Sequence, residues 1–168
     1  MHLETVRRQY LGTLPPAEAG TRATLRVMRD LVRRYKRAGR IRETALELTA
    51  GLRPKDWPAE VRALFEFVRD RIRYVRDVHG VETIQTPDVT LDLEQGDCDD
   101  KSTLLAALLE SIGHPTRFVA VGFSAPDSYS HVYVETRVGP RWIALDPTVP
   151  YAAGWAPPRA ASRLIVHN

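Results

Sequence analysis

The sequence has only one cysteine, Cys98, among its 168 residues. A single cysteine cannot form an internal disulfide, so packing has to hold the fold, and no partner explains the residue structurally. Long apolar runs are missing too. No stretch approaches the roughly 18 apolar residues that span a membrane, and the N-terminal MHLETVRRQY lacks the apolar run of a signal peptide. These absences predict a cytoplasmic protein with no membrane-spanning segment.

Sequence motifs for metal binding are also lacking. Zinc sites favour paired cysteines or histidines at short spacing, and the chain has neither a CxxC nor an HxxxH pair. The acidic run DLEQGDCDD does not have the ligand spacing of a calcium loop. Although Cys98, His131 and nearby carboxylates are all possible ligands, we predict no metal and no other cofactor.

The net charge is small but unevenly distributed. A formal net charge of +3, with 43% hydrophobic and 27% charged residues, is typical of one soluble globular domain. Basic residues crowd the first 42 positions, where apolar residues at helical spacing lie between them. This pattern favours the solvated outer face of a packed helix over a nucleic-acid site, because no groove-reading motif accompanies it. The basic residues are Arg7, Arg8, Arg22, Arg26, Arg29, Arg33, Arg34, Lys36, Arg37, Arg40 and Arg42.

Helical periodicity dominates the first part of the chain after an irregular start. Residues 1–20 contain glycine and proline with little periodicity and are predicted to form an N-terminal arm. We expect one helix over about 21–38, capped by Thr21, and a second over 41–50. A third should begin at Trp57, because apolar residues then recur at three- and four-residue spacing. Its apolar stripe comprises Val61, Leu64, Phe65, Val68 and Ile72.

The stretch 77–96 separates these helices from a further one. It has no convincing period and is long for a structureless connection, so we expect a functional loop. A central helix is predicted over 98–112 from its leucine-rich stripe, and Gly113 and Pro115 should end it.

The period of strands follows the central helix. Three consecutive antiparallel strands are predicted at 116–123, 131–138 and 141–148, and SRLIVHN near the C-terminus could add a short edge strand. Helices followed by strands predict an α+β fold in which the central helix packs on the face of an antiparallel sheet. The predicted single domain covers 21–168, with its helical part at about 21–113 and its sheet part at about 115–168.

Cys98 lies at the first turn of the central helix, with Asp97 in the N-cap position. The partial positive charge of a helix N-terminus, about half an elementary charge, and its free N–H groups both favour a thiolate. However, Asp97, Asp99 and Asp100 crowd the same turn and oppose a second negative charge on the sulfur. The helix dipole alone is therefore not expected to ionise Cys98, and a nearby cation is needed.

His131 and Asp146 are the residues that could complete a catalytic triad with Cys98. His131 opens a predicted strand, where an imidazolium would stabilise the thiolate and later protonate the leaving group. Asp146 ends the next strand, across a tight Gly-Pro turn, and can accept the other ring N–H. Taken one at a time, Cys98 is consistent with a small buried hydrophobe, His131 with an ordinary strand residue and Asp146 with a turn former.

These residues resemble the transglutaminase-like cysteine hydrolases, particularly the short bacterial and phage-associated members. The resemblance runs through GDCDDKSTLLAALLESIGHPTRFVAVG, SHVYVET and WIALDPT and covers about 57–150. In that family a cysteine at a helix N-terminus, a histidine on a later strand and an aspartate on the next strand occur in this order. Cys98, His131 and Asp146 match that order, which implies an architecture of the papain-like superfamily.

The resemblance also implies an oxyanion hole made by a backbone N–H at the cysteine and a side-chain donor upstream. Gln85 is the first candidate for that donor and Gln95 the second, because the amide of a glutamine is a neutral donor. The lack of zinc motifs disfavours the zinc-bearing peptide-N-glycanase branch of the superfamily.

The resemblance implies a thiol-dependent hydrolase of amide, peptide or related acyl bonds that forms a thioester on Cys98. Its partner would be a peptide, protein or other acyl substrate. Two alternatives stay open: amine transfer of the transglutaminase type, and a non-catalytic binding or structural module such as a phage or prophage assembly component. The intact Cys98, His131 and Asp146 disfavour the second alternative.

Two further histidines and a tryptophan are also possible members of the site. His79 and His114 are predicted to be surface residues outside the site. Trp142 shares a strand and, by alternation, a sheet face with Asp146, so it belongs either to the core or to the wall of an active-site cleft.

Overall fold

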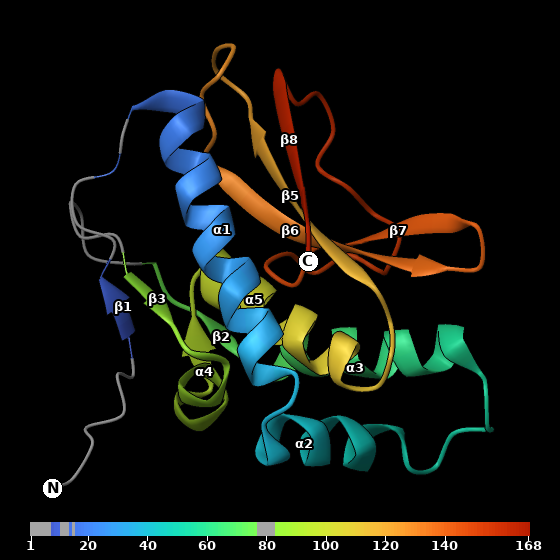
Figure 1. The fold of residues 1–168 in the computed structure, drawn as a ribbon. Coiled ribbons are helices and arrows are strands. Elements are labelled where there is room, and N and C mark those ends of the chain that lie inside the picture. The colour runs from blue at the N-terminus through green and yellow to red at the C-terminus, as the bar shows by residue number, and fades with distance from the viewer. Residues whose placement is uncertain (1–7, 11–13, 15, 77–82) are drawn as a thin grey trace, which may run out of the picture.

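Helices occupy the first two thirds of the chain, and the strands of the main sheet follow them (Figure 1). The computed structural model describes residues 8–10, 14, 16–76 and 83–168. The helices are α1 (Ala17–Tyr35), α2 (Gly39–Thr49), α3 (Trp57–Arg71), α4 (Pro87–Leu93) and α5 (Cys98–Ser111). The main sheet consists of β5 (Thr116–Gly122), β6 (His131–Val138), β7 (Arg141–Leu145) and β8 (Ser162–His167). The shorter strands are β1 (Arg8–Tyr10), β2 (Arg73–Tyr74), β3 (Thr83–Gln85) and β4 (Gln95–Gly96).

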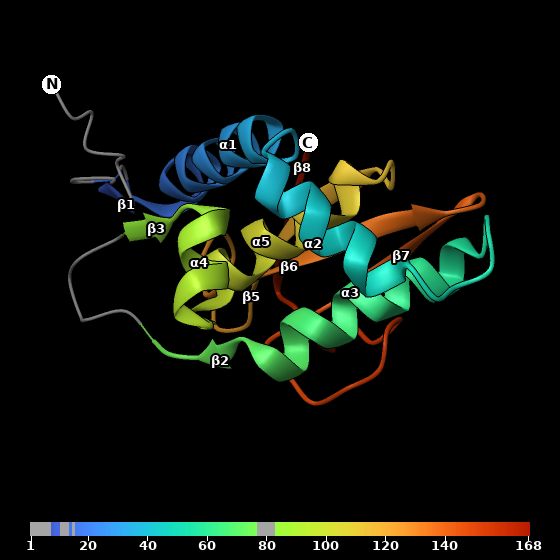
Figure 2. The same cartoon turned by 90° about the horizontal axis from the view of Figure 1, so that it is seen from below.

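Helix α5 is the central element of the fold, as predicted. It contacts α1, α2, α3, α4 and β6, and Figure 2 shows it surrounded by the other helices. The sequence starts this helix at Cys98 because Asp97 and Asp100 form a capping box, in which each side chain accepts a backbone N–H of the other residue. Every residue from position 100 to 109 is buried, so the helix runs through the core.

The main sheet is antiparallel with the strand order β7-β6-β5-β8, which confirms the α+β fold with a helix on one sheet face. The C-terminal segment is the predicted edge strand, β8. One face packs on α5 and α1 through residues such as Phe118 and Val134. The opposite face, called the outer face below, carries a second small apolar cluster. That cluster consists of Val119, Val121, Tyr133 and Ala144.

A two-residue turn joins β6 to β7 and sets the register of the hairpin. Val138 pairs with Arg141, and Gly139 has a φ of 60°, which only glycine adopts at little cost. Pro140 follows with its fixed negative φ, a combination typical of the hairpin turns that begin with glycine. The turn therefore places the start of β6 beside the residue that follows β7.

Helix α1 begins at Ala17, so the predicted start near Thr21 was wrong by four residues. Pro16 occupies the N-cap position, and the helix continues through Gly20, which is buried. Glycine has a low helix propensity, so the sequence argued against a helix through this position. A buried glycine nevertheless allows close packing, which the sequence pattern does not show. Part of the stretch 1–20 is also a strand, because β1 pairs antiparallel with β3.

The stretch 77–96 was predicted to lack regular structure, and its described part contradicts this. Residues 83–96 form β3, α4 and β4, while 77–82, including His79, lie outside the described residues. Strands of two or three residues are too short for a hydrophobic period to be detected. Helix α4 starts at Pro87, a favoured first helical residue, and ends at Leu93, after which Glu94 has a φ of 48°.

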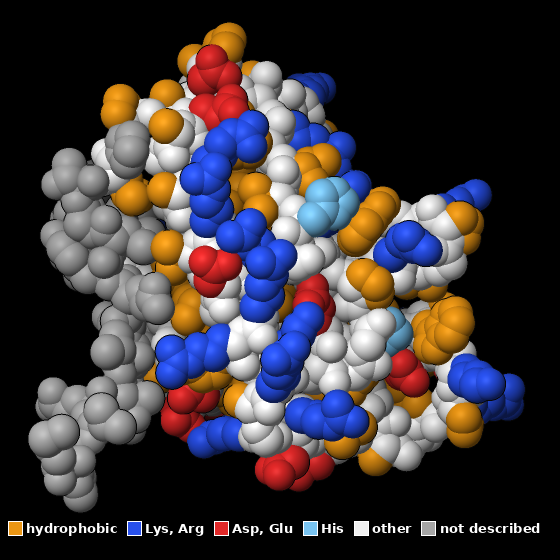
Figure 3. All heavy atoms as spheres, in the orientation of Figure 1, with side chains coloured by type: hydrophobic (Ala, Val, Ile, Leu, Met, Phe, Trp, Pro, Cys, Tyr) orange, Lys and Arg blue, Asp and Glu red, His pale blue; other side chains and the backbone are white. Residues whose placement is uncertain are grey.

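The arginines of α1 lie on its outer side, as predicted for the basic residues of this helix. Figure 3 shows a band of Lys and Arg side chains along this helix. Arg26 and Arg33 are exposed, whereas Leu25 and Met28 on the other side of the helix are buried. Among the described residues, no helix is both long and apolar enough to cross a lipid bilayer.

Candidate active site

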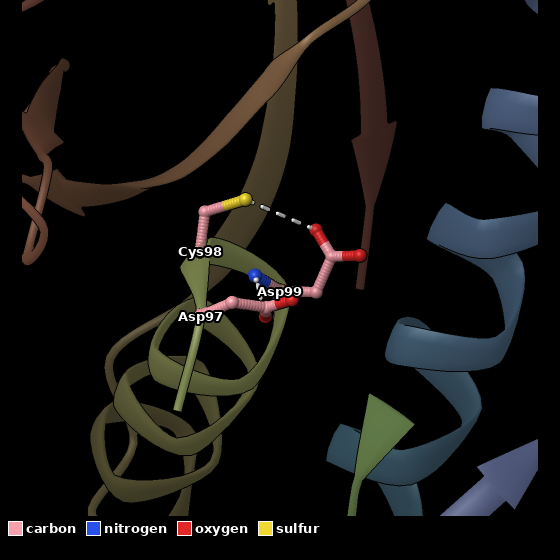
Figure 4. A group of neighbouring side chains, drawn as sticks. All are labelled: Asp97, Cys98 and Asp99. Atoms are coloured by element: carbon pink, nitrogen blue, oxygen red, sulfur yellow. Dashed lines mark hydrogen bonds between the residues drawn. The ribbon is translucent and has the colours of Figure 1, made fainter. Parts of the chain in front are cut away.

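Cys98 is the first residue of α5, and its thiol points away from the helix. Figure 4 shows the sulfur turned toward the carboxylate of Asp99, to which the thiol donates a hydrogen bond of 3.6 Å. Asp97 accepts the backbone N–H groups of Asp99 and Asp100, and the hydrogen bonds of the described residues leave the N–H of Cys98 itself without a protein acceptor. A half-buried thiol with a free N–H beside it is therefore available at the helix start.

The surroundings of Cys98 favour the neutral thiol in the free protein. Burial raises the pKa of the thiol well above its ordinary value, and the negative charges of Asp99 and Asp97 raise it further. A hydrogen bond from the backbone N–H of Val132 opposes this effect without cancelling it. The sequence-based expectation that the helix N-terminus alone does not ionise Cys98 agrees with this balance.

Replacing Asp99 by Asn is expected to lower the pKa of the Cys98 thiol, because it removes a nearby negative charge. Two unit charges about 4 Å apart interact with an energy of about 1 kcal/mol in water. Removing the charge of Asp99 should therefore raise the thiolate fraction, and with it the rate of alkylation by iodoacetamide at pH 7, about fivefold. The rate can be followed by mass spectrometry of the single cysteine. Asp92→Asn, which changes an exposed aspartate on α4 paired with Arg40, is the matched control. An unchanged rate in Asp99→Asn would contradict the assigned cause.

His131 and Asp146 lie together at the neighbouring ends of β6 and β7. The imidazole Nε2 of His131 is 2.7 Å from Oδ2 of Asp146. The other carboxylate oxygen accepts the backbone N–H and the hydroxyl of Thr148, at 3.1 and 2.7 Å. Burial by itself raises the pKa of Asp146, but the hydrogen bonds from His131 and Thr148 outweigh it and lower the pKa below its ordinary value. Asp146 is therefore ionised at neutral pH, so Nε2 carries the hydrogen and Nδ1 has the free lone pair.

The backbone of β6 connects this pair to Cys98. The N–H of Val132 donates to the sulfur, and the carbonyl oxygen of Val132 accepts the hydroxyl of Ser102 on α5 at 3.3 Å. The sulfur therefore lies against the peptide group that joins His131 to Val132. The hydrogen bonds of the described residues do not include one between the sulfur and the imidazole, and the thiol hydrogen goes to Asp99 instead.

The two glutamines predicted as oxyanion donors bind elsewhere in the described structure. The amide of Gln85 donates to Oδ2 of Asp100 at 2.8 Å and weakly to the carbonyl of Gln95 at 3.5 Å. The backbone N–H of Gln85 donates to the other oxygen of Asp100 at 2.7 Å, so this buried pair joins β3 to α5. The amide oxygen of Gln95 accepts a hydrogen bond from Arg73 at 2.7 Å.

Tyr74 lies near the sulfur and was not singled out from the sequence. It pairs with Gly96 across the two strands β2 and β4, two residues before Cys98. Burial raises the pKa of Tyr74, and the charge on Cys98 raises it further, so the two groups are close enough to interact electrostatically. Arg76 hydrogen-bonds to the phenolic oxygen, which leaves the hydroxyl hydrogen to be donated elsewhere.

Lys101 is a second residue that the sequence pattern did not identify. It is 2% exposed, and its ammonium group donates to the carbonyl oxygens of Ile72 and, at 3.3 Å, of Arg69. These carbonyls end α3, so Lys101 caps that helix and holds it against α5 one turn after Cys98. Burial lowers the pKa of Lys101 from 10.5 to about 8, although the charges of Asp70 and Asp146 oppose the shift.

Lys101 should make the stability of the protein depend on pH in the alkaline range. Between pH 8 and 10.5 the folded state holds Lys101 neutral while the unfolded chain is protonated, so stability due to this group rises with pH. Relative to Lys101→Met, the unfolding free energy of the native protein should rise by about 2 to 3 kcal/mol from pH 7 to pH 10, at about 1.4 kcal/mol per pKa unit. Urea unfolding measures it, with exposed Lys55→Met as control. Parallel pH curves for the native protein and Lys101→Met would rule out this role.

One cluster of possible metal ligands surrounds the nucleophile candidate. One ligand atom from each of Asp97, Cys98 and Asp99 lies within 4.8 Å of the others. Asp97 already caps α5 and Asp99 already accepts the thiol hydrogen, so both carboxylates have protein partners. The cluster is accounted for by the start of the helix.

His114 is buried, so the prediction that it is a surface residue was wrong. Its Nε2 lies 2.8 Å from a carboxylate oxygen of Glu60, which joins the end of α5 to the start of α3. The sequence does not reveal this pair, because the two residues are 54 positions apart. The prediction that His114 lies outside the candidate site agrees with this placement.

The chain is similar to known proteins in both sequence family and fold. The family model of the transglutaminase-like superfamily matches residues 42–147. A protein from Parabacteroides distasonis proposed to be a protease has a similar structure, with a TM-score of 0.60 and 16% identity over 73% of this chain and 26% of that one. A proposed cysteine protease from Cytophaga hutchinsonii has a TM-score of 0.56 and 19% identity over 84% of this chain and 52% of that one.

The chain spans about a quarter and about half of the length of these two structures. No curated protein sequence matches it. At these identities the structural similarities establish the fold alone, whereas the family model covers well over half of the chain. That match includes Cys98, His131 and Asp146 and confirms the resemblance found in the sequence. The chain belongs to the transglutaminase-like superfamily.

Proposed function

We propose that the protein is a thiol hydrolase that cleaves amide bonds of peptides or proteins through a Cys98, His131 and Asp146 triad. The observation that carries this proposal is the arrangement at the start of β6. His131 is held by Asp146 through Nε2, while the sulfur of Cys98 lies against the peptide that follows His131. Membership of the transglutaminase-like superfamily supports thiol chemistry at this site.

The proposed reaction begins from a neutral thiol. Because the surroundings raise the pKa of Cys98, Nδ1 of His131 accepts the thiol proton as the sulfur attacks the substrate carbonyl carbon. The tetrahedral intermediate collapses, the C–N bond breaks, and His131 returns the proton to the leaving amine. The product of this half-reaction is a thioester on Cys98.

Hydrolysis of the thioester repeats the same proton transfers with water. His131 removes a proton from water as the water oxygen attacks the thioester carbon, and the proton then goes to the departing sulfur. The carboxylic acid leaves and the neutral thiol is restored. Asp146 keeps the hydrogen on Nε2 throughout and stabilises the imidazolium that forms twice in each cycle. An amine in place of water would give acyl transfer.

The oxyanion of the tetrahedral intermediate needs two donors near the sulfur. The free backbone N–H of Cys98 supplies one of them. Since the amide of Gln85 donates to Asp100, the hydroxyl of Tyr74 is a better second donor than either glutamine. A neutral hydroxyl next to the sulfur meets the requirement that the donor not compete for the proton.

Tyr74→Phe is expected to lower kcat about 100-fold with little change in KM, because one oxyanion donor contributes mainly in the transition state. The measurement is steady-state hydrolysis of an amide substrate. Tyr151→Phe, which removes the hydroxyl of another exposed tyrosine, is the matched control and should be neutral. A larger effect on KM than on kcat would instead indicate a substrate-binding role for Tyr74.

The proposed activity can be tested without knowing the substrate. A peptide library is incubated with the protein in water enriched in oxygen-18, with and without hydroxylamine, and analysed by mass spectrometry. Hydrolysis introduces one heavy oxygen at each new carboxyl group, whereas amine transfer gives hydroxamates instead. Cys98→Ala is the control. The proposal predicts labelled carboxylates that need Cys98, and it fails if no peptide changes or if Cys98→Ala gives the same products. Hydroxamates in excess would favour acyl transfer.

A further inference from the structure

A pocket of about 440 Å³ lies on the outer face of the main sheet, next to the His131 and Asp146 pair. Its floor is formed by side chains of β5, β6 and β7, and the segment that follows Asp146 covers it. Two hydrogen bonds hold this segment over the sheet, from the N–H of Gly154 to the carbonyl of Ala144 and from the N–H of Ala161 to the carbonyl of Gly122, both 2.8 Å. The volume is within the range of small-molecule sites, about 300–1,000 Å³.

Tyr133 joins the pocket to the candidate active site. Its ring lines the pocket and lies 6.4 Å from the imidazole of His131, measured between ring centroids. The residue is 3% exposed, and its hydroxyl makes no hydrogen bond with the residues that the structure describes. The hydroxyl is not among the buried polar atoms that lack a partner, so solvent reaches it from the pocket, and a polar group of a ligand there can accept its hydrogen bond.

The charges around the pocket favour an anion with a single negative charge. Glu135 is 5% exposed and accepts hydrogen bonds from Nε of Arg117 at 2.7 Å and from Arg163 at 2.5 Å. These two guanidinium groups and one carboxylate carry a net charge of about +1, and the ionised Asp146 acts on Tyr133 from the active-site side. Arg117 binds Glu135 through both its Nε and a terminal nitrogen. Arg163 is half exposed, lines the pocket and has further N–H groups that can bind a ligand.

The remaining lining is mostly apolar. Trp142 forms one wall, with the guanidinium of Arg117 packed 4.2 Å from its ring centroid, and Val121, Ala144 and Pro157 complete the surface. A phosphate dianion would need more positive charge than one available arginine. A carboxylate attached to an apolar body fits both the single charge and the lining.

We infer that this pocket binds a carboxylate on the leaving-group side of the substrate, through Arg163 and the hydroxyl of Tyr133. The assignment of this side rests on the proposed function, in which His131 protonates the leaving amine, so the leaving group lies next to His131 and hence next to Tyr133. The carboxylate has two possible sources: the C-terminus of a peptide and an acidic side chain near the cleaved bond.

The binding test uses three small ligands and no turnover. N-acetyl-L-phenylalanine carries a terminal carboxylate, N-acetyl-L-phenylalaninamide is its neutral counterpart, and N-acetyl-L-glutamic acid α-amide carries only a side-chain carboxylate. The dissociation constants are measured by NMR titration, with the indole N–H of Trp142 as the reporter. If a peptide C-terminus is the source, N-acetyl-L-phenylalanine should bind at least tenfold more tightly than its amide. If an acidic side chain is the source, the glutamic acid derivative should bind at least tenfold more tightly than that amide.

Variants identify the groups that recognise the carboxylate. Arg163→Gln should reduce the affinity for the carboxylate to that for the amide, and Tyr133→Phe should weaken it about tenfold, whereas exposed Arg141→Gln should have no effect. Equal binding of the acids and the amide, a Trp142 signal that none of them moves, or an unchanged affinity in Arg163→Gln would overturn the inference.

Turnover separates the failure of this inference from the failure of the proposed function. If peptides are cleaved in a Cys98-dependent reaction but their C-terminal and side-chain carboxylates can be amidated without loss of kcat/KM, the pocket assignment is wrong and the hydrolase stands. If the acids bind through Arg163 but no Cys98-dependent cleavage occurs, the pocket is a carboxylate site and the proposed function is wrong.

Discussion

His131→Ala is expected to reduce kcat on amide substrates by about 10⁴-fold or more, because the thiol then has no base and the leaving amine has no acid. The raised pKa of Cys98 makes this dependence stronger, since very little thiolate exists at pH 7 without help. The measurement is hydrolysis of a peptide found in the library experiment. Stability should fall by about 1–3 kcal/mol, because the variant leaves the buried, ionised Asp146 without the hydrogen bond from His131.

A graded series distinguishes a triad from a single essential histidine. Asp146→Asn keeps a polar group beside the imidazole but removes the charge that fixes the hydrogen on Nε2, so kcat should fall less than in His131→Ala. Thr148→Val removes one hydrogen bond to Asp146 and should have a smaller effect again. Activity in His131→Ala within tenfold of the native protein would contradict the proposed role of the histidine.

A large loss of stability is also expected when Gly122, the last residue of β5, is replaced by alanine. A Cβ atom at this position would lie 1.4 Å from the carbonyl oxygen of Ser128 and 2.6 Å from its carbonyl carbon. Both are backbone atoms, so the segment that leads into β6 would have to move as a whole. We expect Gly122→Ala to lower the free energy of unfolding by about 3 kcal/mol, at the upper end for overpacking. Urea unfolding followed by circular dichroism measures it.

The same substitution should also reduce activity, because the displaced segment ends at His131. Ser130 donates its N–H to the carbonyl of Val121, and this contact fixes the start of β6. Gly51→Ala is the matched control, since a Cβ there meets nothing within 4 Å. That variant should be neutral or slightly more stable than the native protein. Equal stability of Gly122→Ala and Gly51→Ala would contradict the close approach at Gly122.

The long periodic elements could be predicted from the sequence. The sequence placed the start of α3 at Trp57 and both ends of α5 within one residue, because caps and periodicity act locally. The alternating pattern predicted the antiparallel strands β5, β6 and β7 and an edge strand at β8, but not that β8 pairs with β5. The elements within 83–96 were not predicted, since such short segments carry too few residues for a period. The start of α1 was missed because Gly20, which is unfavourable in a helix, is buried within it.

The candidate site shows the same division between local and long-range signals. The hydrogen bond between His131 and Asp146 follows from a short hairpin, so the tight turn between two predicted strands was enough to bring the two residues together. By contrast, the amide of Gln85 donates to Asp100, fifteen residues away, and Lys101 donates to the carbonyl of Ile72, twenty-nine residues away. These pairs depend on how the helices pack, which no local pattern encodes. The acidic turn around Cys98 was visible in the sequence, and its effect on the thiol has the expected sign.

The most direct test of the proposed mechanism is detection of the acyl-enzyme on Cys98. The protein is mixed with p-nitrophenyl acetate, quenched at short times and analysed by intact-protein mass spectrometry, with Cys98→Ala, His131→Ala and the urea-unfolded chain as references. The proposed mechanism predicts one acetyl group on Cys98 that forms rapidly in the native protein and is lost by hydrolysis, while His131→Ala acquires it slowly and retains it. An adduct that forms at the same rate in the native protein, in His131→Ala and in the unfolded chain would show an ordinary thiol and contradict the triad.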